Sequence, residues 1–140
     1  MESKSLYAVY GTLRKKGSNH RYLDNNPNVK FVGSITTDPI FNLKSVSDAF
    51  PALLKKGNTS VVMEIYNVDS AQVETSLDRL EGYSLDAPAE LNYYQKDIID
   101  TPLGPAYVYF WNEKNPSKLS NITSGDWIDY ITAKTKENEK

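Results

Sequence analysis

Residues 60–81 read SVVMEIYNVDSAQVETSLDRLE, a strand signal that runs directly into a helix signal. The first nine residues are rich in β-branched and aromatic side chains, which favour strands. In the remainder, Val73, Leu77 and Leu80 recur at i, i+4 and i+7, so they would form one apolar stripe on a helix. The stretch therefore predicts a strand over its first nine residues and a helix over 70–81.

Strand signals also dominate the rest of the chain. They cover 6–10, 29–36, 41–46, 93–100 and 106–111, with a weaker signal at 50–54. Pro51 favours an edge strand or a bend, and Gly33 is a candidate bulge. The sequence TPLGP, residues 101–105, predicts a hairpin between the last two strands. A short helix is expected from Trp127 onwards.

Many strands with one clear helix predict an α+β fold, either a small mixed β-barrel or a curled sheet with few helices. The length of 140 residues suits a single domain, which we place at residues 1–133. Residues 134–140 are charged and are predicted to be a frayed C-terminal tail.

The composition limits the classes of function. The net charge of −2 implies no general attraction to nucleic acid or to anionic membranes. The chain has no cysteine and one histidine, which excludes thiolate nucleophiles and disfavours a His-rich metal site. It also lacks a nucleotide-binding glycine loop, so neither a metal nor a cofactor is expected. With no apolar run typical of a signal peptide or a membrane span, the expected location is the cytoplasm.

Glu81 is the side chain that the helix pattern singles out. It lies four residues after Leu77, so the two would share one face of a helix. A carboxylate in the last turn also meets the negative end of the helix dipole. Partial burial and the dipole would both raise its pKa, as a general acid–base near neutral pH requires. The alternative is an exposed, inert glutamate at the edge of the stripe.

The segment YGTLR, residues 10–14, follows the first predicted strand. A glycine directly after a strand lets backbone N–H groups approach a ligand closely. Such a group of amides binds a carboxylate or a developing oxyanion without a charged side chain. The alternative is a plain turn. The basic run at 14–16 is interpreted as a solvated loop.

Three residues in the strands are further candidates for the site, and each also has a purely structural interpretation. Glu64 lies between Met63 and Ile65, so strand alternation places it either inward or outward. An inward glutamate would need a partner, such as a tyrosine or a lysine. Tyr94 and Lys96 alternate on one face of a strand, where cross-strand packing is the ordinary use of such a pair.

Seven segments occur in an order that carries a resemblance. They are YGTLRKKGSNHRYL (10–23), FPALL (50–54), VVMEIYNVD (61–69), LDRLEGY (77–83), YYQKDIID (93–100), AYVYFW (106–111) and SGDWIDYI (124–131). Together they resemble the gamma-glutamylcyclotransferase-like family, of the gamma-glutamylamine cyclotransferase type. The combination of YGTLR with LDRLEG at this spacing is the most specific part of the match.

The resemblance implies an enzyme of carbon–nitrogen lyase or acyltransferase type. It would release 5-oxoproline and a free amine or amino acid from a gamma-glutamyl compound, as the α-amino group attacks its own γ-carbonyl. Glu81 matches the family's catalytic glutamate and would carry the proton. The amides of Gly11, Thr12 and Leu13 would bind the acidic end or the oxyanion. Tyr10 would begin this cradle, and Tyr94 would form a pocket wall.

Two positions depart from the family pattern. Met63 stands where the family usually has glycine, and Lys96 stands where it usually has arginine, which binds carboxylates differently. These departures leave open a second hypothesis, a non-catalytic protein that binds or sequesters a small anionic metabolite in the same pocket. A third hypothesis is a protein used for protein–protein contacts. The sequence does not indicate an oligomeric state.

Overall fold

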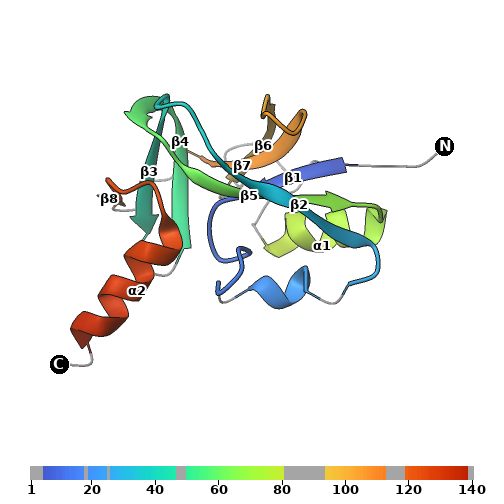
Figure 1. Cartoon of the computed structure of the whole chain (residues 1–140), viewed down its shortest axis with the longest axis horizontal. Helices are drawn as coiled ribbons and strands as arrows, with labels where there is room; N and C mark the ends of the chain where they lie inside the picture. Colours follow the sequence, from blue (N-terminus) through green and yellow to red (C-terminus); the bar gives the residue numbers. More distant parts are fainter. Residues whose placement is uncertain are drawn as a thin grey trace.

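The computed structural model describes residues 5–17, 19–24, 26–46, 50–80, 94–112 and 119–138, with backbone alone for 135–138. The elements within these ranges are β1 (Ser5–Val9), the 3-10 helix η1 (His20–Tyr22), β2 (Val29–Thr36), β3 (Phe41–Val46), β4 (Phe50–Thr59), β5 (Val62–Val68), α1 (Ala71–Leu80), β6 (Tyr94–Ile99), β7 (Ala106–Trp111), β8 (Leu119–Asn121) and α2 (Trp127–Asn138). Mixed strands and helices confirm the predicted α+β class (Figure 1).

The larger sheet has the strand order β2-β5-β1-β7-β6. Its central strand, β1, pairs antiparallel with β5 and parallel with β7. The predicted hairpin joins β6 to β7, with Lys96 directly opposite Tyr109. The register between β2 and β5 shifts between Phe31 and Gly33, so the predicted bulge is present at this glycine.

The smaller sheet has the order β4-β3-β8. Pro51 lies in its edge strand β4, as the missing amide proton of proline predicts. Of the two predicted forms of the fold, the β-barrel is wrong. Closure of a barrel requires the outer strands to pair with each other, whereas the described strands form two open sheets.

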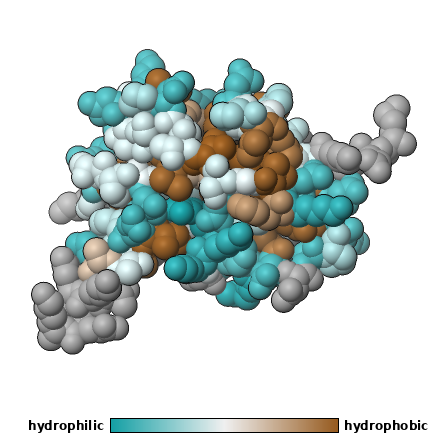
Figure 2. Space-filling view, viewed as in Figure 1, coloured by the Kyte–Doolittle hydropathy of each residue, from teal (hydrophilic) through white to brown (hydrophobic). Residues whose placement is uncertain are grey.

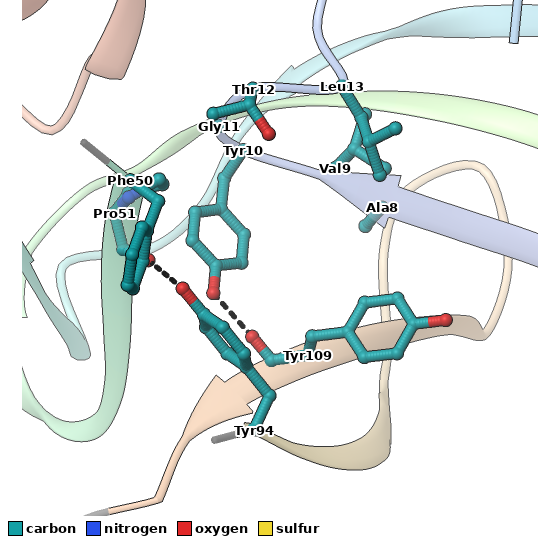
Figure 3. Close-up of a pocket in the computed structure, with 10 residues that line it drawn as sticks. All are labelled: Ala8, Val9, Tyr10, Gly11, Thr12, Leu13, Phe50, Pro51, Tyr94 and Tyr109. Atoms are coloured by element: carbon teal, nitrogen blue, oxygen red, sulfur yellow. Dashed lines mark hydrogen bonds between the residues drawn. The ribbon is translucent and has the colours of Figure 1, made fainter. Parts of the chain in front are cut away.

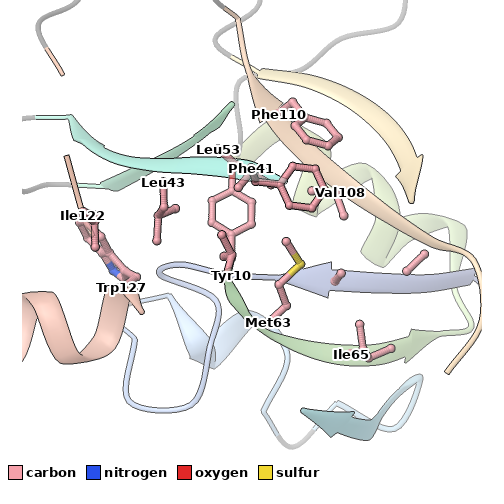
Figure 4. Close-up of a cluster of buried hydrophobic side chains, with 13 residues drawn as sticks. Tyr10, Phe41, Leu43, Leu53, Met63, Ile65, Val108, Phe110, Ile122 and Trp127 are labelled. Carbon is pink, nitrogen blue, oxygen red and sulfur yellow. The ribbon is translucent and has the colours of Figure 1, made fainter. Parts of the chain in front are cut away.

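The two faces of the larger sheet bury different residues because side chains alternate along each strand. On one face, Tyr7 and Val9 of β1 pack in a cluster that includes Leu77 of α1. On the other face, Ala8 and Tyr10 belong to a cluster that reaches the smaller sheet and α2 (Figure 4). Figure 1 shows the two helices at separate ends of the molecule, α1 by the larger sheet and α2 by the smaller one.

Three details differ from the sequence-based expectations. Strand β4 continues to Thr59, and β8 was not predicted at all. Helix α2 continues to Asn138, through most of the segment predicted as a frayed tail. Figure 2 shows apolar surface over the middle of the larger sheet, and Phe31 and Val32 of β2 are among the exposed large apolar residues. None of the helices in the described ranges is both long and apolar enough to cross a membrane.

Candidate active site

A small cavity opens where β1 ends and the following loop begins (Figure 3). Its volume is about 30 Å³. All five residues predicted to bind substrate line this cavity, together with parts of β1, β4 and β7; the lining consists of Ala8, Val9, Tyr10, Gly11, Thr12, Leu13, Phe50, Pro51, Tyr94 and Tyr109. The structure thus brings the predicted cradle residues and Tyr94 to one place, although they are up to 84 positions apart in the sequence.

Two tyrosine hydroxyls hold the walls of the cavity together. Tyr10 donates its hydroxyl hydrogen to the carbonyl oxygen of Tyr109, and Tyr94 donates to the carbonyl oxygen of Pro51 (Figure 3). The Tyr94 ring also packs edge-on against Trp111, with 5.4 Å between ring centroids. Both hydroxyls are therefore used in structure, and both tyrosines are more than nine-tenths buried.

Gly11 is required by a close contact rather than by an unusual backbone angle. A Cβ atom at this position would lie 2.3 Å from Cγ of Pro51, far inside van der Waals contact. The missing side chain lets β4 approach the end of β1, which closes one side of the cavity. We expected a glycine that frees the backbone for a ligand; the structure also gives it this packing role.

The loop after Gly11 is folded back by hydrogen bonds to the carbonyl groups of Gly11 and Thr12. The amide of Arg14 donates to the carbonyl of Gly11 at 3.0 Å, and the amide of Asn19 donates to that of Thr12 at 2.8 Å. The Asn19 side chain adds a bond to the Thr12 hydroxyl at 3.0 Å. Within the described residues, the amides of Thr12 and Leu13 donate no hydrogen bond. These two donors at the cavity rim are therefore unused within the part of the chain that the structure describes.

Arg14 fixes this loop to β5 and to the residue before α2. We call the group that it forms the Arg14 cluster: Arg14, Glu64, Tyr66 and Asp126. The guanidinium donates from Nε to Glu64 at 3.0 Å and from Nη1 to Asp126 at 2.7 Å. Arg14 is only 9% exposed. The interpretation of residues 14–16 as a solvated loop is therefore wrong for Arg14, although Lys15 and Lys16 are exposed.

Glu64 faces inward, which settles the alternation that the sequence left open. Besides Arg14, it accepts hydrogen bonds from the Lys15 amide at 2.9 Å and the Tyr66 hydroxyl at 2.8 Å. Burial, followed by the bond to Glu64, raises the pKa of Tyr66. Burial alone would raise the pKa of Asp126, but the amide of Asp129 and the Arg14 guanidinium outweigh it and hold that pKa below the usual range.

A partly buried cation, Lys96, lies between α1 and the sheet. We call its group the Lys96 cluster: Tyr7, Glu74, Asp78, Lys96 and Tyr109. Lys96 Nζ lies 3.0 Å from Oδ1 of Asp78 and 2.5 Å from the Tyr7 hydroxyl oxygen. Tyr7 in turn donates to Glu74 at 2.8 Å. Burial, and next the bond to Glu74, raise the pKa of Tyr7.

The predicted catalytic residue, Glu81, lies outside the described residues, which on this side end at Leu80, the last residue of α1. Within the described part, Leu77 is fully buried, as the apolar stripe predicted.

No three His, Asp or Glu side chains among the described residues lie close enough together to hold a metal ion.

The sequence matches a family model over residues 7–129, described as "Gamma-glutamyl cyclotransferase, AIG2-like". The chain belongs to this gamma-glutamyl cyclotransferase family. A Vibrio cholerae protein named "Putative gamma-glutamylcyclotransferase" is 39% identical over 126 residues, which cover 90% of this chain and 97% of that protein. The resemblance carried by the seven sequence segments is thereby confirmed.

Solved structures show the same fold. An AIG2-like protein from Mus musculus is 27% identical, with a TM-score of 0.62 over 81% of this chain and 80% of that one. An uncharacterized protein from Pyrococcus horikoshii reaches a TM-score of 0.72 over 97% of this chain and 99% of its own, at 24% identity. The second likeness concerns the fold alone.

The two departures from the family pattern lie away from the cavity. Met63 is fully buried in the apolar cluster beneath the smaller sheet and does not line the cavity. Lys96 lies in the cluster beside α1 and does not line it either. Neither residue narrows the cavity by direct contact, so their effect on this cyclotransferase-family site would be indirect.

Proposed function

We propose that this protein is a gamma-glutamylcyclotransferase, which releases 5-oxoproline and a free amine or amino acid from a gamma-glutamyl compound. The observation that supports this most is the cavity at the end of β1, which gathers Tyr10, Gly11, Thr12, Leu13 and Tyr94 in a chain of this family. The proposed class is carbon–nitrogen lyase or acyltransferase, and the proposed location is the cytoplasm.

The reaction needs only proton transfer and correct geometry. The substrate's α-amino nitrogen bonds to its own γ-carbonyl carbon, and the bond from that carbon to the leaving nitrogen breaks. The α-nitrogen must lose a proton before attack, and the leaving nitrogen must gain one. One carboxylate can do both in turn, with no nucleophilic side chain. We assign this role to Glu81.

The cradle would hold the charged or polarised end of the substrate. The amides of Thr12 and Leu13, with that of Gly11, are backbone donors that can face a carboxylate or the oxyanion at the γ-carbon. The volume of about 30 Å³ is more than the roughly 10–15 Å³ that one water needs, but far less than a glutamyl chain. The cavity therefore fits one polar group, and the rest of the substrate would extend outside it.

Holding the substrate folded would supply much of the rate. A free glutamyl chain samples many extended shapes, whereas ring closure needs the two reacting atoms about 3–3.5 Å apart. Fixing one end at the cradle restricts the chain to fewer conformations. The buried tyrosines Tyr10 and Tyr94, each tied to a backbone carbonyl, keep the walls of the cavity in place.

The experiment is a turnover assay with gamma-glutamyl amines, gamma-glutamyl dipeptides and ε-linked gamma-glutamyl-lysine, followed by the appearance of 5-oxoproline. We expect the parent to act on at least one of these compounds. We expect Glu81→Gln to lower kcat by about 10²–10⁴-fold, the usual range for a general acid–base. Asp38→Asn, which changes an exposed carboxylate, is the matched control and should keep the activity of the parent.

Three results would contradict the proposal. A Glu81→Gln variant as active as the parent would remove Glu81 from the reaction. Tight binding of a gamma-glutamyl compound that is recovered unchanged, with no turnover of any substrate, would favour the second hypothesis of a binding protein. If the protein neither binds nor turns over any of the compounds, the remaining hypothesis is a protein used for protein–protein contacts.

A further inference from the structure

The direction of the Leu13 amide is set by the peptide group to which it belongs. In a planar trans peptide, the N–H of one residue points opposite to the carbonyl of the residue before it. The carbonyl oxygen of Thr12 accepts a hydrogen bond from the Asn19 amide at 2.8 Å. The Asn19 side chain also binds the Thr12 hydroxyl at 3.0 Å. The N–H of Leu13 therefore points away from Asn19, and two hydrogen bonds hold it in that direction.

The direction of the Thr12 amide is set by two peptide groups in series. Nδ1 of His20 lies 2.9 Å from the carbonyl oxygen of Leu13, which can only accept, so Nδ1 carries the hydrogen in this contact. The amide at the other end of that peptide group, that of Arg14, donates to the Gly11 carbonyl at 3.0 Å. The Thr12 amide shares a peptide group with this Gly11 carbonyl and points the opposite way.

These two series of hydrogen bonds begin in one short segment and end on one side of the loop. They begin at Asn19, the residue before η1, and at His20, its first residue. They end at the amides of Thr12 and Leu13, two residues that line the cavity. A hydrogen bond accepted by a carbonyl also polarises its peptide group, which makes the N–H a stronger donor.

We propose that His20 and Asn19 are positioning residues for the cradle, because they aim the amides of Thr12 and Leu13 at the anionic group of the substrate. This inference rests on the proposed function. Neither His20 nor Asn19 lines the cavity, so they act through the backbone of the loop and not by contact with the substrate. Donors that are already fixed in direction need no reordering when the anionic group arrives.

A purely structural role for these bonds would have different consequences. If they only stabilised the loop, their loss would lower the stability of the protein, and the protein that remained folded would bind as before. Positioning predicts a change in the folded protein that differs between the two amides. The His20 bond bears on the Thr12 amide, whereas the bond from the Asn19 side chain bears on the Leu13 amide.

The test compares four variants of the full chain. His20→Leu removes the donor to the Leu13 carbonyl, and His20→Asn keeps a side-chain N–H close to the position of Nδ1. Thr12→Val removes the hydroxyl that Asn19 binds and leaves the amide and a side chain of similar shape. Tyr22→Phe is the matched control, because Tyr22 also lies on η1 but is 37% exposed and does not line the cavity.

Two measurements are made on the parent and on each variant. The first is kcat/KM on the substrate that the parent turns over best. The second follows the amide NMR signals of Thr12 and Leu13 during titration with 5-oxoproline, which carries a carboxylate. We expect 5-oxoproline to shift both signals in the parent.

We expect His20→Leu to lower kcat/KM by roughly 10–100-fold, because a misdirected donor costs less than the roughly 10²–10³-fold lost in kcat when one oxyanion-hole donor is removed. In this variant the shift of the Thr12 signal should fall more than that of the Leu13 signal. Thr12→Val should lower kcat/KM less, because the backbone bond from Asn19 remains, and its larger change should be at Leu13. His20→Asn should recover most of the loss, and Tyr22→Phe should match the parent.

Circular dichroism and thermal unfolding first establish that each variant is folded, and Thr12→Val provides the test if His20→Leu does not fold. An active parent with unchanged kcat/KM and unchanged amide shifts in both His20→Leu and Thr12→Val would overturn the positioning role alone. A loss in His20→Leu that His20→Asn does not recover would also overturn the role of His20.

A parent that is inactive on every substrate would overturn the proposed function, and the titration then decides the positioning role separately. If 5-oxoproline shifts neither the Thr12 nor the Leu13 signal in such a parent, the positioning role is overturned as well. Shifts that are present in the parent and weaker in His20→Leu would support the positioning role in a protein that only binds anions.

Discussion

The Arg14 cluster and the Lys96 cluster each hold a cation away from solvent, but they use different contacts. Each places one cation, largely shielded from solvent, against at least one carboxylate from another element. Arg14 divides its guanidinium between Glu64 on β5 and Asp126 just before α2. Lys96 bonds directly to a single carboxylate, that of Asp78, and is otherwise surrounded by tyrosine rings.

The difference follows from the shapes of the two cations. A guanidinium is planar and presents several donors in fixed directions, so it can fix three segments of chain at once. An ammonium is a compact charge that donates in several directions and accepts an aromatic surrounding. The Arg14 cluster therefore holds the backbone of the cavity loop, whereas the Lys96 cluster holds one helix. The first should therefore matter more for stability than the second.

The largest expected effect on stability is that of Arg14→Met. The substitution leaves Glu64, which is 5% exposed, without its cation. Removing one partner of a buried ion pair costs about 3–5 kcal/mol. We expect the free energy of unfolding, measured with urea, to fall by that amount. The double variant Arg14→Met, Glu64→Leu should recover part of the loss; a double variant that is less stable than either single one would contradict this account.

A smaller effect on stability is expected when each cation is replaced by the other type, arginine by lysine and lysine by arginine. Arg14→Lys cannot reach two carboxylates in fixed directions, and we expect it to lose about 1.5–3 kcal/mol, the value of a hydrogen bond to a charged group. Lys96→Arg keeps a donor for Asp78, and we expect it to lose less than about 1 kcal/mol. Urea unfolding of both variants measures the difference. Equal losses would show that the shape of the cation is unimportant here.

The smallest expected effect is the pH dependence of the stability that Asp126 contributes. Because the folded-state pKa of Asp126 is depressed, its stabilisation is fully present above its unfolded-state pKa of about 3.9 and is lost as the pH falls through the folded-state value. We expect the stability difference between the parent and Asp126→Asn to shrink from pH 6 to about pH 3. An unchanged difference would contradict it. Alkali would not separate the clusters, since Tyr66 and Tyr7 both have a raised pKa.

The sequence correctly predicted the strands and the helix whose own residue patterns favour the structure that they adopt. The strands at 29–36 and 41–46 have the predicted bounds, and α1 lies within the predicted helix. Strand β8 was missed because its three residues, Leu-Ser-Asn, form a strand only through pairing with β3. The end of β4, Lys-Lys-Gly-Asn-Thr, has a composition typical of a turn. Of these five residues only Thr59 pairs with β3, opposite Phe41, and residues 55–58 lie in the register shift before it.

The predicted cradle residues lie together, but their supports were not predictable from local patterns. Glu64 and Arg14 are 50 positions apart, and Asp126 is 112 positions from Arg14. A charged residue in a loop looks solvated unless its distant partners are known. Cross-strand packing was expected for Lys96, but its partner Tyr109 was not predicted. The link from Lys96 to Asp78 on α1 depends on how the helix lies against the sheet. The role of Glu81 stays a prediction.

The central strand of the larger sheet has a consequence for the order in which the molecule is made. Strand β1 leaves the ribosome before both of its neighbours, and the antiparallel neighbour β5 is complete at Val68. Its other neighbour, β7, is complete only at Trp111 and pairs with it in parallel. Contacts between such distant segments form slowly. The cavity, which needs β1 and β7 together, therefore cannot assemble until most of the chain has been synthesised.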